Sequence, residues 1–162
     1  MGDYLRVFCT KEIYPTINQI LKWAKLKGYH LRVDNNYNEV DLDSANWDEV
    51  AIIGEDGQRA FIAELNRDNK KEDSLMRAEV NEFLQILDEL EDVPAEAVAK
   101  VKKHLKEAKY IVALQVTCDY DEEEGDNSVS VFLKYFVDNC GGMVQEDGEG
   151  FFEEDKVIVE LI

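Results

Sequence analysis

Basic residues are scarce in this chain of 162 residues: 18 Lys and Arg stand against 36 Asp and Glu, which gives a formal net charge of −18. Binding to nucleic acid or to an anionic membrane surface requires clustered Lys and Arg, so this balance argues against both partners. The chain does not have the composition of a disordered acidic tail, because 45% of its residues are hydrophobic and 10% are aromatic. Its length predicts a single domain, residues 1–162, with a core large enough to fold without covalent cross-links.

Cysteine is also rare. Cys9, Cys118 and Cys140 are odd in number and far apart in the sequence, which argues against a disulfide framework and favours reduced intracellular thiols. No stretch approaches the ~20 apolar residues that a membrane span needs, and the first residues lack the basic and apolar regions of a signal peptide. We therefore expect a cytoplasmic protein with no membrane partner.

The motifs of several large enzyme classes are missing. The sequence contains no Gly-rich phosphate loop, no dinucleotide-binding Gly-x-Gly-x-x-Gly, no Gly-x-Ser-x-Gly and no Cys-x-x-Cys. The two histidines, His30 and His104, have no partner at the spacing that a helical zinc site uses. These absences disfavour ATP, dinucleotide and acyl-transfer chemistry, and they single out no catalytic residue, metal ligand or cofactor.

What the chain does contain is a regular succession of apolar patterns. Alternating apolar residues predict strands, and apolar residues three and four apart predict helices. Pro15 and Thr16 open the first helix, and Gly28 ends it. The strands are expected at residues 5–9, 29–33, 49–53, 59–65, 110–118, 143–145, 151–152 and 157–162, and the helices at 16–27, 76–90, 94–108 and 128–140.

Four of these elements carry further information. The turn 54–57 contains an Asp-Gly step and predicts a hairpin between its flanking strands. The short join at 91–93 predicts that the two middle helices form a helical hairpin. The run 110–118 is nearly continuously apolar, as in a central strand that is covered on both faces. The final run, 157–162, is apolar enough to predict pairing inside the sheet.

The two ends of the chain resemble each other. Leu5–Cys9 matches Leu114–Cys118, which would bring Cys9 and Cys118 to equivalent strand ends. This pattern predicts two β-α-β-β-type units, at about 3–66 and 109–162, joined by the helical hairpin at about 73–108. An internal duplication and a chance similarity between two strand–helix–strand units both account for it. Either origin predicts an α+β fold with a mainly antiparallel sheet.

The negative charge is concentrated near the carboxyl end. The last 44 residues contain 14 acidic and 2 basic residues, and most of the acids fall in two expected turns, 119–126 and 146–150. The first turn does not fit the calcium loop of helix-loop-helix proteins, because Glu124 occupies the sixth position, where that motif needs Gly. A solvated turn is the better interpretation.

These acids are the candidate partner-binding residues. With an aromatic anchor amid the carboxylates, the set is Asp121, Glu122, Glu123, Glu124, Asp147, Glu149 and Phe151. The alternative for Phe151 is burial, since a turn followed by two adjacent aromatic residues usually buries one of them. The resulting hypothesis is a non-enzymatic protein-binding module of the bacterial cytosol that docks a basic partner, such as a toxin that it neutralises.

Two other functions remain as alternatives. The order of elements from Tyr4 to Leu65 resembles the modules of the vicinal oxygen chelate superfamily, and the resemblance implies a metal-dependent enzyme; the carboxy-terminal unit, however, has no histidine to act as a ligand. The second alternative is a DNA mimic whose carboxylates replace phosphates. Five lysines between residues 100 and 109 make the charge mixed and place this alternative last.

Overall fold

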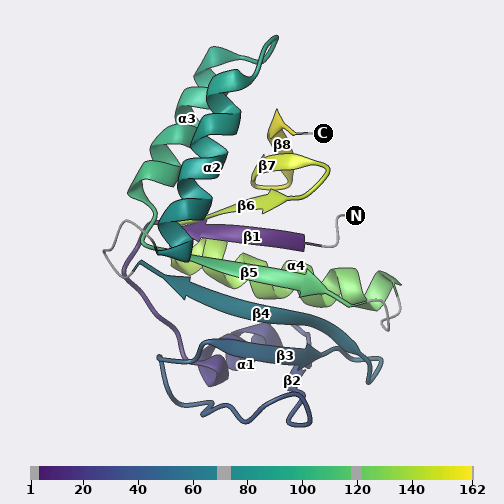
Figure 1. Ribbon diagram of the computed structural model, residues 1–162. Coiled ribbons are helices and arrows are strands. Elements are labelled where there is room, and N and C mark those ends of the chain that lie inside the picture. The colour runs from purple at the N-terminus through teal and green to yellow at the C-terminus, as the bar shows by residue number, and fades with distance from the viewer. Residues whose placement is uncertain (1–3, 69–73, 118–121, 162) are drawn as a thin grey trace.

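The computed structural model of the chain describes residues 4–68, 74–117 and 122–161. These residues form one eight-stranded antiparallel sheet with helices on both of its faces (Figure 1). The predicted α+β fold with a mainly antiparallel sheet is therefore confirmed.

The elements follow one another along the chain in the predicted order. They are β1 (Tyr4–Cys9), α1 (Ile17–Leu26), β2 (Arg32–Val33), β3 (Glu49–Ile53), β4 (Arg59–Arg67), α2 (Leu75–Glu89), α3 (Ala95–Glu107), β5 (Tyr110–Val116), α4 (Glu122–Asn139), β6 (Gly142–Glu146), β7 (Gly150–Glu153) and β8 (Lys156–Glu160). The strand order in the sheet is β2-β3-β4-β5-β1-β6-β7-β8.

The central strands β1 and β5 pair antiparallel, with Val7 opposite Val112. All five residues from Tyr110 to Leu114 are buried, which confirms the expected coverage of β5 on both faces. Strand β1 alternates between two environments: Val7 faces the helices α1 and α4, and Phe8 faces α2 and α3, yet both side chains are fully buried. The sheet thus separates two hydrophobic cores.

The helices divide between these cores. On one face, α1 and α4 pack over the sheet through residues such as Ile20 and Phe132. On the other face, α2 and α3 form the predicted helical hairpin and contribute Met76 and Leu105. Figure 1 shows this hairpin crossing the strands and extending past β8, while α1 and α4 lie behind the sheet.

Two strand predictions were wrong in part. The second strand is only Arg32–Val33, because Gly28 and Tyr29 still belong to the helix end, where the Tyr29 N–H donates to the carbonyl of Ala24 at 3.0 Å. The last strand, β8, lies at the edge of the sheet and not inside it. Its Val157 is 41% exposed.

The predicted start of the last helix, at residue 128, was also wrong. Helix α4 starts at Glu122, so Glu122–Asp126 belong to its first turns instead of forming a turn before Ser128. Acidic residues are favoured in the first turn of a helix, where they face the positive end of the helix dipole. The rest of the predicted turn, residues 119–121, lies outside the described part of the chain.

The internal duplication stays a prediction. The two strands that the sequence similarity matches, β1 and β5, are neighbours in the sheet. However, the second neighbour of β5 is β4, the last strand of the first unit, whereas the second neighbour of β1 is β6, the second strand of the second unit. The two units are thus inserted into the sheet differently.

Gly150 opens β7 at a point where the backbone of β8 approaches closely. Its φ is +133°, and a Cβ there would collide with the carbonyl oxygen of Val159. We expect Gly150→Ala to lower the free energy of unfolding by about 3 kcal/mol. The control is Gly57→Ala, where φ is +80° and no atom lies within 4 Å of the added Cβ; it should cost only about 1 kcal/mol. Urea unfolding measures both values, and equal losses would contradict the close approach.

Candidate functional site

The predicted partner-binding residues are distributed over different environments. Asp147 and Glu149 lie in the turn between β6 and β7, and the Glu149 side chain is exposed. Asp121 lies outside the described residues, and Glu122–Glu124 are placed only as backbone in α4. The exposure of the side chains in the first acidic cluster, residues 121–124, is therefore not described.

Phe151 is not available to a partner. Its side chain is 0% exposed and packs in the core beneath α2, with its ring centroid 5.5 Å from that of Phe83 and 6.0 Å from that of Phe8. The structure thus agrees with the alternative interpretation of Phe151, burial in the core, and not with its role as an exposed anchor. The neighbouring Phe152 points to the opposite face and is only half-buried.

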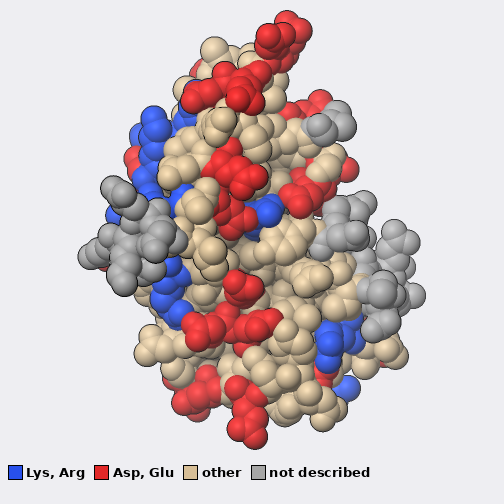
Figure 2. All heavy atoms as spheres, viewed as in Figure 1, with Lys and Arg blue, Asp and Glu red and all other residues tan. Residues whose placement is uncertain are grey.

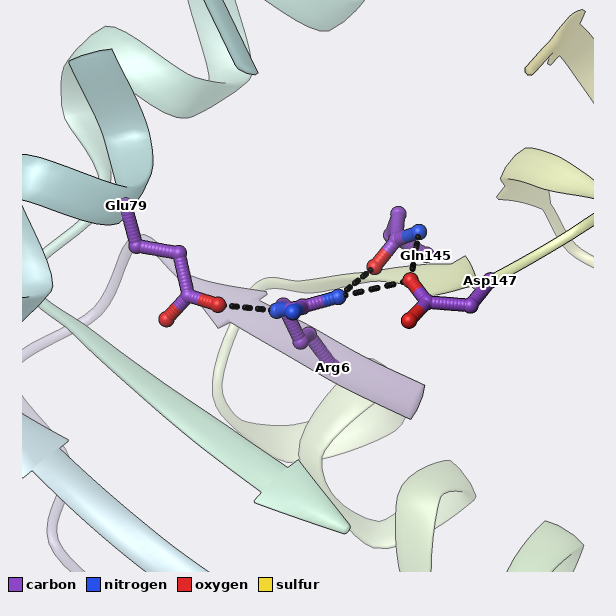
Figure 3. Close-up of polar contacts among 4 residues, drawn as sticks. All are labelled: Arg6, Glu79, Gln145 and Asp147. Carbon is purple, nitrogen blue, oxygen red and sulfur yellow. Dashed lines mark hydrogen bonds and ion pairs between the residues drawn. The ribbon is translucent and has the colours of Figure 1, made fainter. Parts of the chain in front are cut away.

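Asp147 is tied to a charge on the central strand (Figure 3). The Arg6 guanidinium, from β1, donates to Asp147 Oδ1 at 2.8 Å and to Gln145 Oε1 at 2.7 Å, and it also pairs with Glu79 of α2. Gln145 Nε2 in turn donates to Asp147 Oδ1 at 2.9 Å. This network connects the β6–β7 turn, the central strand and α2.

Arg6 is well shielded from solvent. Its side chain is 15% exposed, and its guanidinium carbon lies 4.4 Å from the centroid of the Tyr4 ring and 5.1 Å from that of Phe83. A charge in such surroundings needs partners of opposite sign, which Glu79 and Asp147 supply. The negative charge of Asp147 is therefore partly neutralised by Arg6 within the fold, which leaves less of it to attract a partner.

The other side of the sheet carries a groove of about 670 Å³ between α4 and the strands β6 and β7. We call it the acid-rimmed groove. Its apolar lining comes from α4, β1, β6 and β7, and its polar lining from α4, the end of β6 and the turn between β7 and β8. The lining residues are Leu5, Val129, Ser130, Leu133, Lys134, Val137, Asp138, Val144, Glu146, Phe152, Glu154 and Asp155.

The apolar floor of the acid-rimmed groove is accessible because no described helix lies above this part of the sheet. Helix α4 packs on β4, β5, β1 and β6, but no described helix covers β7 and β8 on this face. Val144 and Phe152 therefore remain half-buried, and Val157, the register partner of Phe152, is exposed.

The rim is acidic. Asp138, Glu146, Glu154 and Asp155 surround the floor, and Lys134 is the one basic residue of the lining. Lys134 Nζ lies 3.7 Å from Asp138, one helical turn away. Glu154 and Asp155 have no ion-pair partner among the residues that the structure describes. An apolar floor with excess carboxylates at its border suits a ligand that is both apolar and cationic.

The structure places two of the three cysteines. Cys9 and Cys140 are both buried, and both thiols are close to the Tyr110 hydroxyl in the core. Cys118 lies outside the described residues, so the expected equivalence of Cys9 and Cys118 stays a prediction. Burial raises the pKa of Cys9 and of Cys140, which disfavours the reactive thiolate. His30 is exposed beside α1 and does not join them.

Metal-binding geometry is not apparent in the part of the chain that the structure describes. There, no three or more His, Cys, Asp and Glu side chains are placed to hold a metal ion together. His104 is instead held by the fold: its Nε2 lies 2.7 Å from the carbonyl oxygen of Phe8. Nothing in this geometry favours the metal-dependent alternative.

Comparisons with protein-family models, with curated proteins and with solved structures find no match for this chain. Among the described residues, no helix has the length and apolar character needed to cross a membrane. The function must therefore be argued from the geometry of the chain itself.

Removing the Arg6 charge should be costly. We expect Arg6→Met to lower the free energy of unfolding by about 3 kcal/mol, because Glu79 and Gln145 lose their shared partner in a shielded site. Lys134→Met removes the same charge from an exposed pair and should change stability by at most ~0.5 kcal/mol. Chemical denaturation compares the two, and a similar small effect for both would refute the structural role of Arg6.

His104 should make stability depend on pH. Burial lowers its pKa in the folded protein, outweighing the hydrogen bond to Phe8 and the nearby Glu107. Below pH ~6.5 the unfolded chain then takes up a proton before the folded chain does, so stability falls as the pH falls. His104→Gln should lose this contribution, whereas His30→Gln, at an exposed histidine, should retain it. Urea unfolding between pH 7 and 5 measures the difference, and identical profiles for all three proteins would count against it.

Proposed function

We propose that this protein is a non-enzymatic protein-binding module of the bacterial cytosol that docks a basic partner at the acid-rimmed groove. The observation that carries the proposal is the combination of an apolar floor, with Val144 and Phe152, and a border of carboxylates in one depression of the surface. Protein interfaces are commonly built in this way, with an apolar centre and a polar rim.

The net charge supports a basic partner. At −18 the protein attracts cationic surfaces over a distance of roughly a Debye length and repels acidic ones, which speeds association with the correct partner. The charge is not uniform. Figure 2 shows Lys and Arg gathered along the flank formed by α3, where Lys100 pairs with Glu153 and Lys102 with Asp88. A basic partner should avoid that flank.

Neutralisation of a basic toxin is one function that such a module performs. It requires only that the partner's cationic surface be covered, and no reactive group in the module takes part. The groove fits this requirement, since its lining combines carboxylates with aliphatic and aromatic side chains.

Charge reversal at the rim tests the proposal. We expect Glu154→Lys with Asp155→Lys to reduce, by at least about tenfold, the retention of a basic protein from a lysate of the source organism. The matched control, Glu89→Lys with Glu91→Lys, makes the same change of charge at exposed positions near the tip of the α2–α3 hairpin. It should retain that protein as the wild type does.

Quantitative mass spectrometry of the retained proteins, with elution by increasing salt, gives the measurement. The proposed partner is basic, is lost from the groove variant alone and elutes at moderate salt. Equal retention on both variants, or no retained basic protein, would overturn the proposal.

A further inference from the structure

The sheet is covered unevenly on its two faces. Residues of β7 and β8 such as Phe151 and Val159 are buried beneath the α2–α3 hairpin on one face. On the opposite face, α1 and α4 cover the strands only as far as β6. A helix is about 10 Å wide and neighbouring strands are about 4.8 Å apart, so one helix covers roughly two strands. The uncovered part of this face therefore has the width of one more helix.

The side chains on the uncovered part of this face are apolar, like those on which a helix packs. Val144 of β6 and Phe152 of β7 line the groove, and Val157 of β8, opposite Phe152, is 41% exposed. Leu133 and Val137 of α4 form one wall. From Val129 to Val137 the groove follows α4 for about 12 Å, which is two helical turns.

The position on the sheet face discriminates between a helical and an extended occupant. The N–H and C=O groups of the strands lie in the plane of the sheet and bond to neighbouring strands. An extended segment lying on the face would find no backbone partners there, whereas a helix satisfies its own backbone hydrogen bonds.

We propose that the acid-rimmed groove receives an amphipathic helix of the partner, beside α4, with its apolar side on Val144, Phe152 and Val137. Lys and Arg residues at the border of that apolar side meet Asp138, Glu154 and Asp155 at the rim. The inference rests on the proposed function and adds to it the conformation and the patterning of the bound segment. Such a helix completes the layer that α1 and α4 begin.

The probe is a synthetic peptide of about 14 residues made of Leu and Lys, with Leu at helical spacing along one side. Its control has the same composition with Leu and Lys alternating, which favours a strand. Fluorescence anisotropy of the labelled peptides gives the affinities. We expect the helical peptide to bind at least about fivefold more tightly, and amide NMR shifts on binding to concentrate in α4 and β6–β8.

The variant Val137→Glu distinguishes binding in the groove from attraction by the net charge of the protein alone. If charge alone attracted the peptide, one more carboxylate would leave binding unchanged or strengthen it; occlusion of the apolar floor should weaken it by at least about fivefold. Leu26→Glu adds the same charge at a side chain that is 80% exposed on α1, and should change the affinity by less than about twofold. Phe152→Ala removes floor area without adding charge and should weaken binding in the same direction, whether or not Val137→Glu folds.

The outcomes distinguish the two levels of the proposal. If both peptides bind equally, with shifts scattered over the surface and no effect of the floor variants, the helical occupant is refuted while attraction of a basic partner stands. If neither peptide binds at low salt, the proposed function fails with it.

Discussion

The antiparallel pairing of β1 with β5 is the constraint on which the rest of the structure depends. Because both strands are buried on both faces, neither can satisfy its remaining backbone groups with water, and each needs a second strand beside it. Strands β4 and β6 fill these positions, and the outer strands extend the sheet from there. The helices of the described residues then divide between the two faces, since Val7 and Phe8 point in opposite directions from one strand.

Arg6 shows how this centre determines the geometry of the groove. It is held between α2 and the β6–β7 turn by Glu79 and Asp147, so β6 is fixed relative to the helical hairpin. The opposite side of β6 forms the floor of the groove through Val144. A groove built from strands and a helix in this way is largely preorganised, so its own side chains would lose little conformational entropy if the proposed partner bound there.

Local patterns predicted most of the elements, because spacing and turn chemistry act over a few residues. Thr16 and Gln19 form the capping box of α1, and Gly54–Gly57 makes the predicted hairpin turn. Strand order escaped prediction: the apolar run of β8 reads like an inner strand, and only the complete sheet shows it to be an edge. For the groove, the sequence pointed to Asp147 and Glu149 of the β6–β7 turn, but neither residue is in the lining. A two-residue aromatic run does not reveal which ring is buried, and it is Phe152, not the predicted Phe151, that lines the groove. The contribution of α4 to the groove depends on tertiary packing that no local pattern encodes.

The position of β1 has a consequence for how the chain folds. Its two neighbours, β5 and β6, follow it by more than 100 residues, as the pairing of Val7 with Val112 and with Val144 shows. Loop-closure entropy must be overcome before these contacts form, which makes the contact order high and folding comparatively slow. During synthesis on the ribosome, β1 therefore emerges long before β5 and β6, the two strands with which it pairs in the folded protein. In that interval it is exposed to mispairing and to chaperones.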